Sequence, residues 1–299
     1  MKTLQSRGEV AFRRISYVVI SLWALMAILP FLLIIISSLT EENSLVNNGF
    51  SFFPKEWSLN SYTYMIKQAK IILRSYGISL GATVAGTCIS LILTSMLGYV
   101  LSRPDFRLRG VLSFFVYFTM LFSGGTVPSY IMWTRAFHIT DTFWALVIPN
   151  YLVSAFNVFL VRNYYKNNIP AALQEAARLD GASNMQIFFR IMLPLSTPVN
   201  VTVGLFTALT YWNDWINALY YIDDTKLQGI QSLLVRMMDN IQFLASPAGA
   251  QLAGGKYIAL PTNGIRMAMA VIGILPILVL LPFAQKYIVR GVVVGAVKE

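Results

Sequence analysis

Long apolar stretches alternate with short polar connections along almost the whole chain. A helix that crosses a bilayer needs roughly 20 mostly apolar residues. The stretches that meet this length are residues 18–39, 78–101, 111–132, 142–161, 198–221 and 267–288. The third contains Gly124, Gly125 and Pro128, and the fifth contains Asn213 and Asp214, so these two are the least regular. The pattern predicts an all-α polytopic membrane protein with six transmembrane helices in one transmembrane domain, residues 18–289.

Composition supports this prediction. Hydrophobic residues make up 56% of the 299 positions and charged residues only 12%, whereas soluble domains carry about 25% charged residues. The first apolar stretch is too long for the core of a signal peptide and lacks a small-x-small cleavage site, so we interpret it as an uncleaved span. Cys88 is the only cysteine, which excludes an internal disulfide, and we expect it to be a small buried apolar residue.

The distribution of Lys and Arg predicts the orientation. The formal net charge is +10, but there is no RNP-like or helix-turn-helix pattern to read nucleic acid. If six spans are present, one face holds 14 basic and 5 acidic residues and the rest of the chain 9 and 8. Basic residues accumulate on the cytoplasmic side, so residues 1–17 and 290–299 are predicted to be cytoplasmic. The basic residues on this face are Lys2, Arg7, Arg13, Arg14, Arg103, Arg107, Arg109, Arg162, Lys166, Arg178, Arg190, Lys286, Arg290 and Lys298.

The connection between the fourth and fifth stretches, residues 170–194, carries strong helix signals. Pro170 suits the first turn of a helix, and Ala171–Leu179 contains strong helix formers. Gly181 suits a left-handed C-terminal cap, and Ser183 with Gln186 suits a capping box that begins a second short helix. The alternative is a helix lying on lipid headgroups, but such helices favour Lys, Arg and large apolar residues, so this Ala-rich helix fits a protein partner better.

The segment EAARLDGASNMQIFFRIMLP, Glu175–Pro194, resembles the EAA signature of ABC importer permeases. Glu-Ala-Ala, Gly, Ile and Leu-Pro all stand at the expected spacing, and we expect Pro194 to end the second helix. The resemblance implies a cytoplasmic segment that docks on a separate ATPase subunit, whose closure drives the spans between inward-facing and outward-facing states. The residues that it assigns to this coupling are Glu175, Ala176, Ala177, Asp180 and Gly181.

Three further motifs narrow the resemblance to carbohydrate importers. GYVLSRPDFRLRG (Gly98–Gly110), YWNDWINAL (Tyr211–Leu219) and QKYIVRGVVVGAVKE (Gln285–Glu299) are similar to the second permease subunit of the maltose-transporter-like subfamily. The resemblance implies the type I importer architecture in a bacterial cell membrane and an oligosaccharide substrate. It also implies a second, non-identical permease subunit, two ATP-binding subunits and an extracellular solute-binding protein.

The chain shows no nucleotide or metal motif of its own. A P-loop needs GxxxxGK followed by Ser or Thr. The nearest match, Gly254-Gly255-Lys256-Tyr257, has Tyr257 in place of the hydroxyl residue and Ala250 in place of the first Gly. ATP and Mg²⁺ are therefore expected on the partner ATPase, with no cofactor here. His138 is the only histidine and has no metal-ligand cluster around it. No Ser/His, HExxH or paired-carboxylate arrangement indicates an enzyme.

Polar residues inside the spans are candidates for the substrate path. Sugar sites combine flat aromatic rings with amides or carboxylates that bind hydroxyls. The residues of these types in the fourth and fifth stretches are Trp212, Asn213, Asp214, Asn217 and Asn157, with Asn150 and Tyr151 as weaker candidates. The alternatives are that Asp214 and the tryptophans mark the outer membrane interface and that Asn157 bonds between helices. The net charge does not indicate an acidic sugar, because the basic surplus is cytoplasmic, but four basic residues predicted to be external keep that alternative open: Lys226, Arg236, Lys256 and Arg266.

Two other functions remain as alternatives. One is an ABC permease for a non-sugar solute, because the sugar motifs are less specific than the EAA segment. The other is a secondary transporter or channel that works alone, which would have no need for Glu175–Pro194. Buried acids that could relay protons are scarce, with Asp214 the only one.

Overall fold

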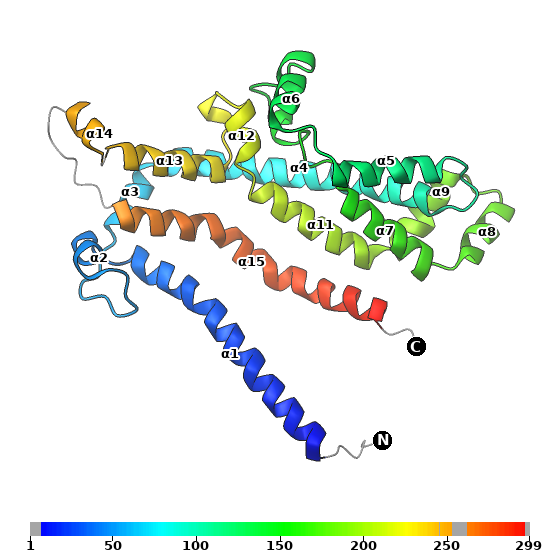
Figure 1. Cartoon of the computed structure of the whole chain (residues 1–299), viewed down its shortest axis with the longest axis horizontal. Coiled ribbons are helices and arrows are strands. Elements are labelled where there is room, and N and C mark those ends of the chain that lie inside the picture. Colours follow the sequence, from blue (N-terminus) through cyan, green and yellow to red (C-terminus); the bar gives the residue numbers. More distant parts are fainter. Residues whose placement is uncertain (1–6, 245, 253–261, 297–299) are drawn as a thin grey trace. The chain divides into compact units, whose positions relative to one another are not determined.

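The computed structural model describes residues 7–244, 246–252 and 262–296, almost all of them helical (Figure 1). Within these residues the only β-structure is an isolated antiparallel bridge between Thr40 and Trp57. The chain forms two compact units: one joins the N-terminal part up to Ala69 with Met237–Leu275, and the other joins Lys70–Arg236 with the C-terminal part from Pro276. The Gly254–Tyr257 motif and the terminal residues Lys2 and Lys298 lie outside the described residues.

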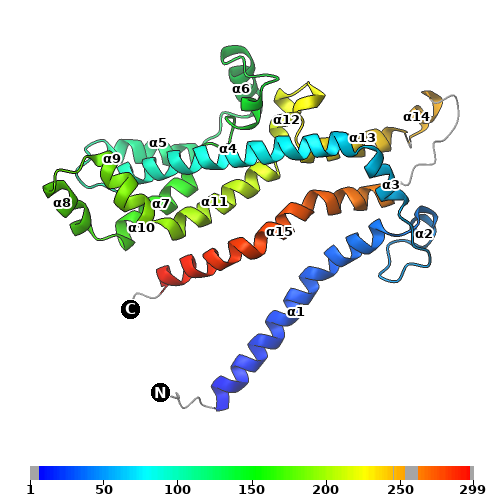
Figure 2. The same ribbon diagram turned by 180° about the vertical axis from the view of Figure 1, so that it is seen from behind.

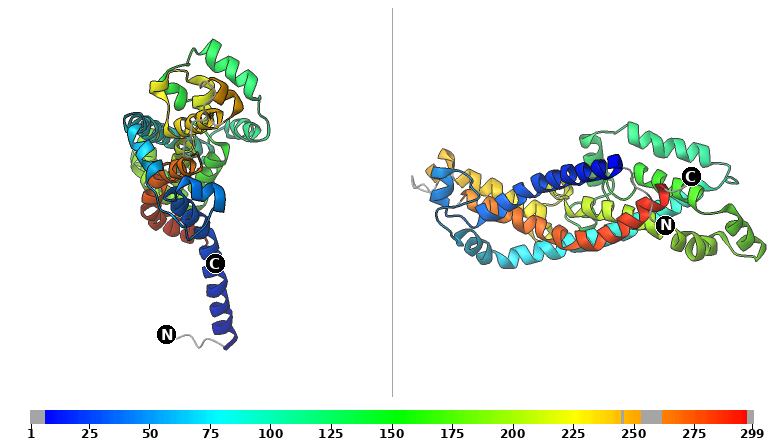
Figure 3. Two further views of the ribbon diagram at one scale, coloured as in Figure 1. Left: turned by 90° about the vertical axis from the view of Figure 1, so that its left-hand side faces the viewer. Right: turned by 90° about the horizontal axis from the view of Figure 1, so that it is seen from below.

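The first unit contains a long apolar helix and several short ones. Helix α1 runs without a break through Pro30 (Figure 3), which a membrane helix tolerates. None of its most apolar window is buried by the chain itself, so lipid or another subunit must cover it. The helices of this unit are α1 (Arg7–Ser38), α2 (Glu42–Asn48), α3 (Asn60–Lys67), α14 (Pro247–Leu252) and parts of α13 (Ile230–Leu244) and α15 (Thr262–Ala296).

A carboxylate joins two distant parts of this unit. Glu42 accepts hydrogen bonds from the backbone N–H groups of Asn263 and Gly264, at 3.0 and 2.9 Å. It also accepts from the Thr262 hydroxyl at 3.2 Å. The first N–H groups of a helix have no partner inside the helix, so Glu42 caps the start of α15 from more than 200 positions away in the sequence.

The second unit packs around the long helix α4. Its helices are α4 (Ala69–Ser102), α5 (Arg109–Leu121), α6 (Thr126–Ile131), the π-turn η1 (Met132–Ala136), the 3₁₀ turn η2 (Phe143–Leu146), α7 (Ala155–Asn168), α8 (Ala171–Leu179), α9 (Asn184–Ile187), the π-turn η3 (Phe188–Met192), α10 (Leu193–Leu195), α11 (Thr197–Trp212), α12 (Ile216–Tyr221) and the 3₁₀ turn η4 (Thr225–Leu227). Helices α4 and α11 lie close together at Gly86, where an added Cβ would overlap the Tyr211 ring. Small residues that allow such contact are typical of membrane helix pairs.

Two buried apolar clusters hold this unit together. The first gathers Tyr99 of α4, Tyr165 of α7 and Phe188 of η3 with their neighbours. The second gathers Ala82 of α4, Val147 and Tyr221 of α12 with theirs. The first cluster anchors the predicted coupling segment through η3, and the second anchors the breaks in the fourth and fifth apolar stretches.

Fewer continuous spans are present than the apolar stretches predict. Among the described residues, three helical segments are long and apolar enough to cross a bilayer: Ala11–Ser38, Ala69–Ser102 and Thr262–Val279. Two bent pairs bring the number to five, if each pair counts as one span. The all-α polytopic class is thus confirmed, while six spans with both termini cytoplasmic stay a prediction.

The fourth predicted stretch, residues 142–161, is not one helix. It contains η2, then an irregular connection, and then α7, which begins only at Ala155. Pro149 has no N–H to donate, and Asn150 has a positive φ of 69°. The Pro149 carbonyl accepts from the Asn217 amide at 3.2 Å. Irregular backbone is possible at membrane depth when it is buried in protein in this way.

The third and fifth stretches are also broken, at the polar and glycine positions they contain. The helix axis turns by 114° between α5 and the α6–η1 pair, across Gly124 and Gly125. The fifth helix, α11, ends at Trp212, and Asn213 to Trp215 separate it from α12. The second span begins at Ala69, earlier than the predicted residue 78, and the sixth at Thr262, earlier than 267.

Candidate functional site

The predicted coupling segment folds as helix, glycine turn, helix at one end of the second unit (Figures 1 and 2). Gly181 has a φ of +80°. The Ala182 N–H donates to the Ala177 carbonyl at 2.9 Å, and the Gly181 N–H to the Arg178 carbonyl at 3.0 Å. This pair of bonds is the Schellman motif, which closes a helix with a left-handed residue. The predicted role of Gly181 as a C-terminal cap is therefore confirmed.

The capping box that begins the second helix is also present. The Gln186 N–H donates to the Ser183 hydroxyl at 3.3 Å, and the Ser183 N–H donates to the Gln186 side chain at 2.7 Å. Two details differ from the prediction. Pro170, with ψ of 133°, precedes the first helix instead of lying in it. The second helix passes through the π-turn η3 and ends at Leu195, one residue beyond Pro194.

The side chains of helix α8 lie on the surface of the chain. None of its residues is buried. Glu175, Ala176, Asp180 and Gly181 are exposed, while Ala177 packs against the first apolar cluster. Leu179 is 89% exposed.

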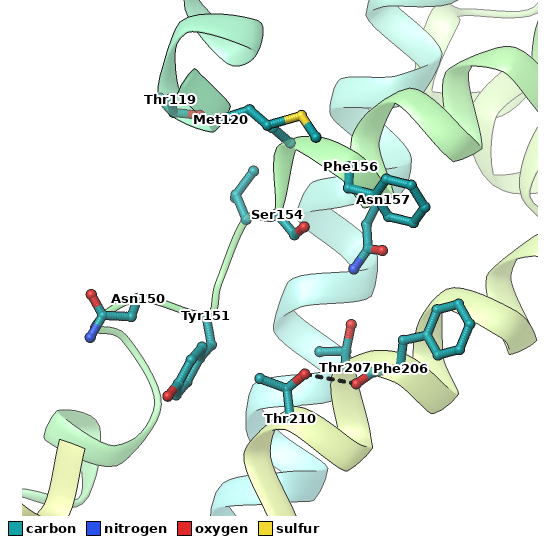
Figure 4. Close-up of a pocket in the computed structure, with 12 residues that line it drawn as sticks. Thr119, Met120, Asn150, Tyr151, Ser154, Phe156, Asn157, Phe206, Thr207 and Thr210 are labelled. Carbon is teal, nitrogen blue, oxygen red and sulfur yellow. Dashed lines mark hydrogen bonds between the residues drawn. The ribbon is translucent and has the colours of Figure 1, made fainter. Parts of the chain in front are cut away.

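A second candidate site is a cavity of about 640 Å³ between α5, α7 and α11 (Figure 4). Every residue of its lining is uncharged. Apart from Val153 and Ala155, the lining residues are labelled in the figure: Thr119, Met120, Asn150, Tyr151, Ser154, Phe156, Asn157, Phe206, Thr207 and Thr210. Hydroxyls, amides and aromatic rings are the groups that bind sugar hydroxyls and ring faces.

Two polar side chains in this cavity have no hydrogen-bond partner in the described part of the chain. The hydroxyl of Thr207 is buried without one. The amide of Asn157 belongs to a residue only 8% exposed and makes no hydrogen bond with other described side chains or backbone. Buried polar groups are usually paired, so a polar ligand or water is the natural partner for both.

The other predicted path residues do not line this cavity. Asn213 and Asp214 border a neighbouring hollow of about 320 Å³. Asp214 accepts hydrogen bonds from the Tyr151 hydroxyl at 3.2 Å and from the N–H groups of Ile216 and Asn217 at 3.0 and 3.1 Å. Its carboxylate therefore stabilises the break between α11 and α12.

Trp212 and Asn217 are packed inside the protein. Trp212 is 6% exposed, with its ring 5.9 Å from that of Tyr76. Asn217 is fully buried and accepts from the Asn150 amide at 3.1 Å. Of the main predicted path residues only Asn157 lines the large cavity, and both weaker candidates, Asn150 and Tyr151, also line it.

Sequence reasoning missed Ser154, Thr207 and Thr210. A usable signal is present in α11, where Thr207 and Thr210 are three residues apart and so lie on one helix face. The unique Cys88, expected to be buried, is instead exposed on the surface of the chain.

Comparison with known proteins decides the family. Residues 90–294 match the family described as the inner membrane component of binding-protein-dependent transport systems. The chain belongs to this family. The permease is accordingly a multi-pass protein of the cell membrane and a subunit of an ABC transporter, not an enzyme by itself.

Relatives of this permease carry names from carbohydrate transport. It is 36% identical to the polygalacturonan/rhamnogalacturonan transport system permease protein YtcP of Bacillus subtilis (strain 168), over 96% of this chain and 98% of the relative. It is 25% identical to the trehalose/maltose transport system permease protein MalG of Thermococcus litoralis, over 98% and 99% of the two chains. The resemblance to MalG-type carbohydrate permeases is thus confirmed.

A solved structure has the same fold. A chain in the crystal structure of a bacterial ABC transporter involved in the import of the acidic polysaccharide alginate superimposes with a TM-score of 0.78. The two chains are 27% identical, and the match covers 96% of this permease and 99% of that chain.

Proposed function

We propose that this permease imports an oligosaccharide, delivered by an extracellular solute-binding protein, by alternating access driven by a separate ATPase. The observation that carries the proposal is the near full-length similarity to permeases named for galacturonan and for trehalose and maltose transport. The uncharged cavity supports it, because its hydroxyl, amide and aromatic groups suit a sugar better than an ion or an amino acid.

The proposed assembly has two non-identical permease subunits, two ATP-binding subunits and one binding protein. Six spans with both termini in the cytoplasm place α8 on the side where ATP is available. The ATPase docks on Glu175, Ala176, Asp180 and Gly181, with Ala177 holding α8 against the permease. The exposed Leu179 supplies apolar area to the same contact. ATP and Mg²⁺ belong to the partner.

In the proposed path, the sugar contacts Asn157, Thr207 and their neighbours in the large cavity. No cationic side chain borders it, so these contacts recognise hydroxyls and ring faces. An acidic sugar would have to find its counter-charges elsewhere in the assembly.

The test is ATP hydrolysis by the complex purified with its own partner subunits and binding protein. We expect vanadate-sensitive ATPase activity that rises on addition of one class of oligosaccharide, with galacturonate oligomers, arabino-oligosaccharides and maltotetraose as probes. Amino acids and phosphate serve as negative controls. Stimulation by a non-sugar solute alone would contradict the substrate class, and sugar transport by the isolated chain without nucleotide would refute the importer mechanism.

A further inference from the structure

The connection between α4 and α5 carries a motif that the roles above leave unassigned. Ser102 to Gly110 reads SRPDFRLRG. It follows the last turn of α4 and lies beside α9, at the same end of the second unit as α8 (Figures 1 and 2). Three charged residues there, Arg103, Asp105 and Arg178, form one contact network.

Asp105 is the centre of this network. It accepts from Arg103 through both carboxylate oxygens, with the Nε bond at 3.1 Å. Its Oδ2 also lies 3.4 Å from Nη2 of Arg178, on α8. The described part of the chain contains two ion pairs, and both include Asp105.

Arg103 extends the network to the second helix of the coupling segment. Its Nη1 donates to the Asn184 side chain at 2.6 Å, and Asn184 is the first residue of α9. Its guanidinium also lies 5.7 Å from the centroid of the Tyr99 ring, which belongs to the first apolar cluster. The end of α4 is thereby attached to the helices on both sides of the Gly181 turn.

Apolar packing alone does not fix this end of the coupling segment. Helix α8 buries no residue. A cavity of about 340 Å³, lined by Met96, Tyr99, Phe106 and Met185 among others, separates α4 from α9 below the network. The polar contacts at its rim therefore act together with the apolar packing of Ala177 and Ile187 in attaching α8 and α9 to the end of α4.

Helix α4 leads from this network to the candidate substrate path. The Ser95 hydroxyl of α4 donates to the Asn200 side chain of α11 at 3.0 Å, and Gly86 lies against Tyr211. Thr207 and Thr210, on the same α11, line the large cavity. A shift of the α4 end would thus reach the cavity through one packed helix pair.

We propose that Arg103, Asp105 and Arg178 form a brace that passes movement of the coupling segment to α4. The three are positioning residues: they contact neither nucleotide nor sugar, and they make α8, α9 and the end of α4 move as one body. The inference rests on the proposed docking of the ATPase on α8. It names the residues through which docking of the ATPase on α8 acts on the large cavity.

The brace keeps its charge under cellular conditions. Hydrogen bonding from Arg103 is the main cause that lowers the pKa of Asp105 to about 2, from an ordinary value of 3.8. The folded pKa lies below the unfolded one, so the stabilising effect is complete above about pH 4 and is lost only as pH falls toward 2. Proton uptake therefore does not switch the brace in the cytoplasm.

The test is Asp105→Asn in the complete complex, reconstituted in proteoliposomes with its binding protein and a transported sugar. Asp105 lies outside the docking segment, and exposed ion pairs add little to folding stability, so assembly should be retained. We expect the number of sugar molecules transported per ATP hydrolysed to fall by up to about five-fold, the largest effect that a partly exposed ion pair supports.

Further variants separate a brace from a general charge effect. Arg178→Gln should lower the ratio in the same way, and the double variant should be no worse than either single one, because the two residues act through one contact. Arg178→Lys should restore most of the ratio. Arg107→Gln is the matched control, since Arg107 is an exposed residue of the same connection whose side chain forms no hydrogen bond or ion pair with other described residues.

Two outcomes would overturn the proposal. One is an unchanged ratio in Asp105→Asn. The other is loss of the ATPase subunits from the purified variant, which would mean that Asp105 shapes the docking surface instead of transmitting movement. Absence of nucleotide-dependent transport in the unaltered complex would instead refute the proposed function itself.

Discussion

At the scale of single residues, the sequence predicts backbone chemistry better than side-chain environment. Gly181 and the Ser183–Gln186 capping box follow from local rules, and both are present as predicted. Polar residues inside membranes tend to face cavities, which predicts such a place for Asp214 and Asn217. The Asp214 carboxylate instead accepts from backbone N–H groups two and three residues later, and the Asn217 amide donates to the Pro149 carbonyl of a distant segment, a need that no local pattern reveals.

Replacing Gly181 tests the left-handed turn. A Cβ at Gly181 would meet nothing within 4 Å, so the cost of Gly181→Ala arises from its positive φ alone. We expect a penalty of about 1 kcal/mol or more and fewer ATPase subunits co-purifying with the permease. Gly181→Asn should be milder. Gly110→Ala is the control, because that position is equally open and has no positive φ. Equal effects at the two glycines would contradict the argument.

Replacing Thr207 tests the substrate path. Thr207→Val removes a hydroxyl that has no partner in the described structure, so the stability of the permease should not fall. If the hydroxyl binds sugar, the apparent KM of uptake should rise about two- to ten-fold, the effect of losing one hydrogen bond. Thr202→Val, on the same helix, is the control, since its hydroxyl already donates to the Pro198 carbonyl. Unaltered KM for Thr207→Val would exclude this contact.

At the scale of elements, apolar length predicts where spans lie but not where they break. The first, second and sixth stretches are long helices, although the first contains Pro30 and the sixth Pro276, so a proline alone does not decide where a span breaks. The fourth is divided because Pro149 lacks an N–H group and the surrounding protein supplies other partners to its backbone. Such partners come from α12, about 70 residues later, and only the tertiary structure brings them together.

The cap on α15 provides a prediction for a single element. Glu42→Ala leaves the first N–H groups of α15 without their acceptor, and we expect a loss of about 1 kcal/mol in stability. The measurement is the thermal denaturation midpoint of the detergent-purified complex. Glu56→Ala, an exposed glutamate of the same unit whose carboxylate makes no described contact, should leave the midpoint unchanged. A similar decrease in both variants would argue against capping.

At the scale of the whole molecule, the sequence predicts the orientation of the chain across the membrane, and this orientation can be tested by experiment. The charge distribution places residues 102–110 in the cytoplasm and residues 40–76 outside. A chain with a single native cysteine is well suited to a direct test, since Cys88→Ser provides a cysteine-free background.

Labelling with a membrane-impermeant maleimide tests which connections lie outside the cell. In intact cells from which any cell wall has been removed, Phe53→Cys should react, because Phe53 is 90% exposed and lies in a predicted external connection. Arg107→Cys should react only after permeabilisation. Reaction of Arg107→Cys in intact cells would reverse the predicted orientation and place the coupling segment outside the cell.

The broken fourth stretch has a consequence for leakage. Its Val147 carbonyl accepts a hydrogen bond from the Tyr211 hydroxyl at 2.7 Å, and its Pro149 carbonyl accepts one from the Asn217 amide. Bare carbonyls at that depth would attract water and ions. Because side chains of the fifth stretch donate to both, these two carbonyls are not free to draw water into the break.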